Sequence, residues 1–93
     1  MKGEEQFEIF VNYAKKLYEL EDKDYKKFKA ITNEEIRDYL KKENINFYLI
    51  FEYMSEEQKE DLIYYYLSNV SLRFALKTWY EDYKNDSQRM VEK

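Results

Sequence analysis

The sequence predicts an all-α protein, a single domain over residues 1–93 built as a compact bundle of four to five helices. Three observations indicate this fold. Apolar side chains recur at helical spacing along most of the chain. The chain contains no proline and only one glycine, so few residues interrupt a helix. Residues suited to helix N-caps precede several of the periodic segments. Aromatic residues make up 19% of the chain, which supplies core volume without disulfides.

The first predicted helix covers residues 4–21, about five turns. Its main apolar face consists of Phe7, Phe10, Val11, Ala14, Leu17 and Tyr18. These residues follow the i, i+3, i+4 and i+7 spacing of one helical face. A second, narrower stripe consists of Ile9, Tyr13 and Leu20. Two apolar stripes indicate that this helix contacts two neighbours, either within the fold or in another molecule.

A short helix is predicted for residues 24–30, and a stronger start signal follows it. Thr32 is a good N-cap residue, and Glu35 lies three positions later. Together they match the capping box, in which each side chain accepts a hydrogen bond from the other residue's backbone N–H. The sequence therefore predicts a helix from residue 33 to about residue 43.

Residues 45–54 are apolar on nearly all sides, and periodicity alone does not separate a buried helix from a strand here. A hairpin would need residues 62–67 as the partner strand. The connection over residues 55–61 has neither glycine nor proline, and Ser55 with Gln58 forms a second capping-box match. These features favour a helix over residues 45–54, with the hairpin as the alternative.

The last periodic segment runs over residues 56–85 and carries two apolar arcs. One arc is Leu62, Ile63, Tyr66, Leu67, Val70 and Phe74, and the other is Tyr65, Leu72, Leu76, Trp79 and Tyr83. Either one long helix has partners on two sides, or the segment breaks at residues 68–71, where serine and asparagine favour caps over helix interiors. We favour the break. Residues 85–93 are predicted to form a frayed tail.

The composition excludes several classes of chemistry. The chain has no histidine and no cysteine, which excludes disulfides, thiolate metal sites and catalysis by either residue type. We expect no catalytic residues, no metal and no cofactor. The net charge of −4 disfavours direct nucleic-acid binding, which draws its affinity from basic groups. No apolar run approaches the roughly 20 residues of a membrane span, and no apolar signal segment follows Met1. A cytoplasmic protein is expected.

One acidic pattern suggests an enzymatic alternative. Glu5-x-x-Glu8 is followed by Glu35-x-x-Asp38, which resembles the magnesium motif of the all-helical MazG-type nucleotide pyrophosphohydrolases. The resemblance implies Mg²⁺-dependent hydrolysis of a nucleotide, with these four carboxylates as the metal ligands. The pattern is short, however. The chain has five acidic pairs at i, i+3, where about four are expected by chance from its acid content.

A second acidic segment suggests a partner-binding site. Glu56, Glu57, Glu60 and Asp61 open the predicted helix that continues into three tyrosines. Such carboxylates also complement the helix dipole, which is the plainer explanation. The segment Asp61-Leu62-Ile63-Tyr64-Tyr65 resembles one in the colicin DNase immunity proteins, small acidic four-helix inhibitors in which this region contacts the nuclease. Tyrosine supplies contact area and carboxylates steer a basic partner. The predicted partner-binding residues are Glu57, Asp61, Tyr64 and Tyr65.

The sequence as a whole favours a small acidic protein-binding module without enzymatic activity. We expect an intracellular regulator or inhibitor of phage or mobile-element type, with an anti-defence role, that blocks a basic nucleic-acid-handling enzyme. Its aromatic residues exceed what a core of this size can hide. The alternative is a self-associating protein. Its homodimer patch would be the Ile9, Tyr13 and Leu20 stripe or the arc of Tyr65, Leu72, Leu76 and Trp79.

Overall fold

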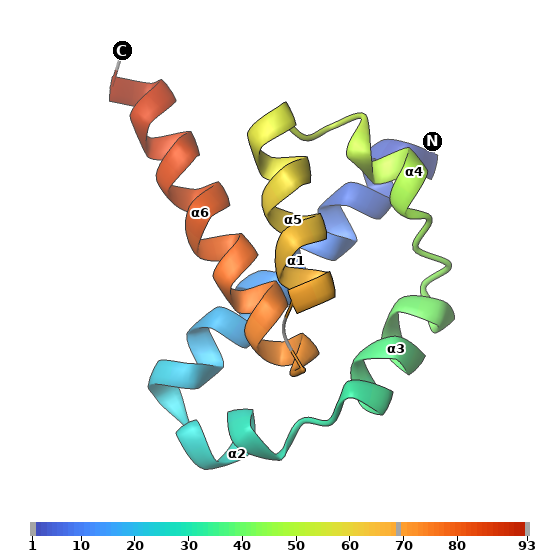
Figure 1. Cartoon of the computed structure of the whole chain (residues 1–93), viewed down its shortest axis with the longest axis vertical. Coiled ribbons are helices and arrows are strands. Elements are labelled where there is room, and N and C mark those ends of the chain that lie inside the picture. The colour runs from blue at the N-terminus through green and yellow to red at the C-terminus, as the bar shows by residue number, and fades with distance from the viewer. Residues whose placement is uncertain (1, 69, 93) are drawn as a thin grey trace.

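Polar caps and short turns divide the chain into helices over residues 2–68 and 70–92, the part that the computed structural model describes (Figure 1). Six helices are present there: α1 (Lys2–Lys23), α2 (Tyr25–Ala30), α3 (Asn33–Lys42), α4 (Phe47–Phe51), α5 (Glu56–Ser68) and α6 (Leu72–Glu92). The predicted all-α bundle is confirmed. The described helices outnumber the predicted four to five, although the segments predicted one by one, with the favoured break at residues 68–71, already add up to six.

The predicted capping box at the start of α3 is present. The Glu35 backbone N–H donates to Thr32 Oγ1 at 3.1 Å, and the Thr32 backbone N–H donates to Glu35 Oε1 at 2.9 Å. The same reciprocal pair opens α5, between Ser55 and Gln58, at 3.1 and 3.0 Å. Each pair satisfies two N–H groups that a helix terminus leaves without an intrahelical partner. Both boundaries therefore follow from local sequence.

The helix predicted over residues 45–54 is shorter in the structure. Asn46 caps α4, its Oδ1 accepting the Tyr48 N–H at 2.9 Å. After Phe51 the chain tightens into a turn, in which the Tyr53 N–H bonds to the Ile50 carbonyl at 3.0 Å. The described residues contain no strand, so the hairpin alternative was wrong.

The predicted break in the last periodic segment is confirmed, because α5 ends at Ser68 and α6 begins at Leu72. The connection is held from α3. Asn33 Nδ2 donates to the Val70 carbonyl at 2.7 Å, and Asn33 Oδ1 accepts the Leu72 N–H at 2.8 Å. The backbone of α6 is helical as far as Glu92. The side chains of residues 87–93 lie outside the described part of the chain, and the frayed tail predicted for residues 85–93 stays a prediction.

Helix α6 packs most extensively against α1 and α5, and the core lies between these three helices (Figure 1). Trp79 of α6 is fully buried. Its ring meets Phe10 of α1 edge to face at 5.0 Å between centroids, and its indole N–H donates to the Gln58 carbonyl of α5 at 3.1 Å. A buried tryptophan stabilises a core through its large apolar area, and the hydrogen bond from its N–H fixes its orientation. This contact sets how α5 lies on α6.

Neither of the patches predicted for self-association is a free surface. Leu72, Leu76 and Trp79 are between 0% and 4% exposed, so the arc that contains them is core. In the other stripe, the Tyr13 ring stacks on Tyr39 of α3 at 4.0 Å between centroids, and Leu20 packs against the core. Tyr13 and Leu20 of α1 and the arc of Leu72, Leu76 and Trp79 of α6 therefore pack inside the fold.

Candidate functional site

Helix α5 lies beside α6, near the centre of the view in Figure 1. Its inward residues Gln58 and Leu62 are buried. Its outward face carries large apolar side chains, with Ile63 45% exposed, Tyr64 66% and Leu67 81%. Single exposed apolar residues are ordinary, whereas three within five positions on one helix form a contiguous apolar patch.

An apolar groove of about 350 Å³ runs between α4 and α5. Its lining contains no charged side chain and consists of Phe47, Tyr48, Phe51, Leu62, Ile63, Tyr66 and Leu67. We call it the α4–α5 groove. It arises because α4 is apolar on all sides but only five residues long, so it buries Ile50 and leaves other rings outward. Tyr48 at its edge is 83% exposed.

Ring contacts fix the floor of the α4–α5 groove. The Phe47 ring meets Tyr66 of α5 edge to face at 5.5 Å and Phe10 of α1 at 6.0 Å between centroids. Phe51 packs against the core from the same helix. Because these rings are held by several neighbours, the groove is formed before any partner arrives, which lowers the entropic cost of binding.

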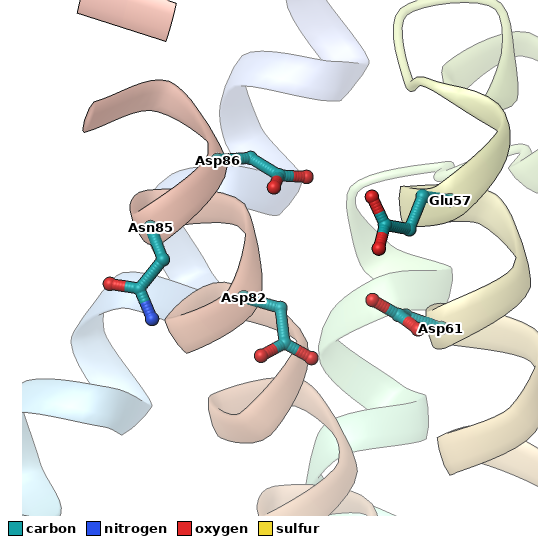
Figure 2. A pocket seen from close by; sticks show the side chains of 5 residues that line it. All are labelled: Glu57, Asp61, Asp82, Asn85 and Asp86. Atoms are coloured by element: carbon teal, nitrogen blue, oxygen red, sulfur yellow. The ribbon is translucent and has the colours of Figure 1, made fainter. Parts of the chain in front are cut away.

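A second groove, between α5 and α6, is acidic. It has a volume of about 350 Å³ and is lined by Glu57 and Asp61 of α5 and by Asp82, Asn85 and Asp86 of α6. We call it the α5–α6 groove. Figure 2 shows the carboxylates of the two helices pointing toward each other across it, whereas Asn85 points away from α5. Four carboxylates thus face one small volume, where they attract a cationic group.

Burial and neighbouring carboxylates affect the protonation of Asp61 in this groove. The pKa of Asp61 is raised above its ordinary value, first by burial and then by the nearby charges of Asp82 and Glu57. The Tyr65 hydroxyl donates to Asp82 Oδ2 at 2.7 Å and links the two helices across the groove. This hydrogen bond is the main reason that the pKa of Tyr65 is also raised.

The structure brings the four predicted partner-binding residues together on one side of α5. Glu57 and Asp61 line the α5–α6 groove. Tyr65 is half-buried beside them through its bond to Asp82, and the exposed Tyr64 ring meets the Tyr65 ring edge to face at 5.7 Å. The four residues therefore form one edge of the surface rather than its centre.

The sequence analysis missed the other half of each groove. It did not single out Asp82 and Asp86, although their i, i+4 spacing places them on one face of α6, next to Tyr83 on the adjoining face. It also read residues 45–54 only as buried structure and so missed Tyr48 as a rim residue. The signal for α4 was present, because a short helix that is apolar on every side cannot hide all its side chains.

The two acidic pairs that resemble the MazG magnesium motif do not meet. Glu5 and Glu8 line one surface depression, and Glu35 and Asp38 line another. Glu35 also accepts the hydrogen bond that caps α3. Over residues 2–68 and 70–92, no group of three or more acidic side chains is arranged to hold a metal ion.

Two findings concern the chain as a whole. Within the described residues, no helix combines the length and apolarity needed to cross a membrane. No protein-family model, curated protein or solved structure matches this chain.

Proposed function

We propose that this chain is a protein-binding module that docks a partner on the exposed face of α5, over the α4–α5 groove. The observation that carries the proposal is the groove itself, which is apolar along its whole lining and includes two strongly exposed side chains, Tyr48 and Leu67. Burying apolar side chains such as these is favourable, and a partner that docks over them would bury them.

This surface fits a regulator or inhibitor that acts by covering a surface of its partner. A partner seated on α5 meets apolar side chains along the α4–α5 groove and carboxylates along the α5–α6 groove. A basic enzyme that handles nucleic acid presents the complementary charge, and occupying its basic surface would exclude its substrate. Self-association through the same groove is the competing role, because an apolar groove also fits a second copy.

The proposal is tested by capture of partners from the cells that produce the protein. We expect Tyr48→Ser combined with Leu67→Ser to reduce the main captured protein by at least about tenfold, because both side chains are central to the apolar contact. Both are more than 80% exposed, so their loss leaves the fold intact. Capture is quantified by mass spectrometry against the wild-type chain.

A matched control uses another exposed tyrosine. Tyr25 of α2 is 54% exposed and lies outside both grooves. Tyr25→Ser should leave capture unchanged. Equal losses in the two variants, or no loss in the groove variant, would contradict the proposed surface. Light scattering of the purified wild-type protein and of the Tyr48→Ser, Leu67→Ser variant tests the competing role, self-association. A wild-type dimer that becomes a monomer in this variant would identify a second copy as the occupant.

A further inference from the structure

Exposed carboxylates precede the residues of α5 that line the α4–α5 groove. Glu56, Glu57 and Glu60 are exposed in the first two turns of α5, and Glu52 is exposed where α4 ends. Glu60 lies three residues before Ile63 of the groove lining, on the same face of the helix. Lys59, the cation within this stretch, is engaged by Glu56 at 2.8 Å. One lysine therefore balances only part of this acidic charge.

The exposed apolar side chains at the groove are spaced as a bound helix would require. Ile63 and Leu67 are four residues apart on α5, one turn, and Tyr48 of α4 lies on the other side of the groove. An amphipathic helix places apolar side chains at i, i+3, i+4 and i+7, and such a stripe fits a groove formed by two helices. An extended peptide would instead need an exposed strand edge for backbone pairing, and the described residues contain no strand.

We infer that the α4–α5 groove takes a basic amphipathic helix of another protein, with its apolar stripe between Tyr48 and Leu67 and its lysine or arginine side chains over the carboxylates of α5. This inference rests on the proposed function and names the chemistry of the partner. Charge complementarity selects the occupant: a two-fold pair of copies joined through α5 would bring the same carboxylates together, because an isologous contact matches each patch with itself.

The test uses two synthetic helical peptides of about 14 residues, roughly four turns. One carries leucine on one face and lysine on the other; the second has glutamate in place of every lysine. Binding to the intact protein is measured by calorimetry at low and at moderate salt. We expect the lysine peptide to bind at least about tenfold more tightly, with an affinity that falls as salt rises.

Variants locate the peptide on the surface. Leu67→Ala should weaken the lysine peptide about tenfold at both salt concentrations. Glu57→Gln with Glu60→Gln should weaken it about threefold or more and flatten the salt dependence. The control is Glu19→Gln with Asp22→Asn, which removes two exposed carboxylates of α1 far along the chain from α5 and should leave the affinity unchanged.

Each outcome decides the inference. Equal binding of the two peptides, or lysine-peptide binding that Leu67→Ala leaves unchanged, would overturn it. If the lysine peptide fails to bind while Tyr48→Ser with Leu67→Ser still abolishes partner capture, the docking surface stands and the basic helix is wrong. If the groove variant has no effect on capture, the proposed function fails first. A dimer that excludes the lysine peptide would identify a second copy as the occupant and also overturn the inference.

Discussion

Asp61 is the residue at which the stability of the fold and the proposed binding role have opposite requirements. It lies on α5 among Glu57, Asp82 and Asp86, and its pKa is raised above the ordinary value of 3.8 by burial and by these charges. Its ionised form is therefore disfavoured in the folded protein relative to the unfolded chain. A carboxylate held at a cost to stability becomes favourable when a cation arrives, which is consistent with a binding role.

The linkage between this pKa and stability has a definite sign. Below pH 3.8 the carboxyl is protonated in both states and contributes nothing. As the pH rises through the higher pKa of the folded state, ionisation costs more in the folded protein, and stability is lost. We expect Asp61→Asn to raise the free energy of unfolding at pH 7 by up to about 1 kcal/mol, a gain that disappears at pH 3.

Urea unfolding at the two pH values measures this difference. Asp22→Asn is the control, because Asp22 is exposed on α1 and lines none of the grooves described above. It should change stability by less than about 0.5 kcal/mol at either pH. An Asp61→Asn variant that is less stable at pH 7 would show that the carboxylate makes a favourable contact in the fold.

At the scale of elements, the surface depends on how α5 ends. Asn33 of α3 holds the connection to α6 through two hydrogen bonds, to the Val70 carbonyl and from the Leu72 N–H. Arg73 extends the same link, since its Nη1 donates to the Ile31 carbonyl at 2.7 Å. These contacts tie α3 to the start of α6 and so fix the direction in which α5 leaves the core.

We expect Asn33→Ala to destabilise the protein by about 1 kcal/mol, because it removes two hydrogen bonds that are exposed or only partly buried, where water can replace the lost partner. Amide hydrogen exchange should also quicken at Leu72. Asn12→Ala, at an exposed position of α1, is the control and should leave both measurements nearly unchanged. Unchanged exchange at Leu72 in Asn33→Ala would mean that the connection is held by other contacts.

The element boundaries show what a sequence can predict here. The starts of α3 and α5 followed from Thr32 with Glu35 and from Ser55 with Gln58, because a capping box is a local pattern. The link from Asn33 to Leu72 could not be predicted, since it joins residues 39 positions apart that meet only after folding. The α5–α6 groove could not be predicted for the same reason, because its lining comes from two helices that meet only after folding.

At the scale of the whole molecule, the chain buries its largest rings and still leaves others in water. Trp79 and Phe10 are fully buried, whereas Tyr48 and Tyr64 are 83% and 66% exposed. Composition alone predicted this excess of aromatic surface. It did not predict where the excess gathers, because helical periodicity assigns faces to a helix but not the neighbours that cover them.

The exposed face of α5 unites the features that set this molecule apart. One side of the helix borders apolar lining and the other borders carboxylates. The central claim is that a partner protein covers this face. An outward helix face ordinarily carries polar side chains, and the exposed apolar side chains of this face are the reason for the proposal.

Photo-crosslinking tests this claim most directly. Leu67 is replaced by p-benzoylphenylalanine, and in a parallel variant Tyr25 receives the same residue as the control. After irradiation in the cells that produce the protein, we predict a discrete crosslinked partner at position 67 that is absent at position 25. No adduct at position 67, or the same adducts at both positions, would contradict the account.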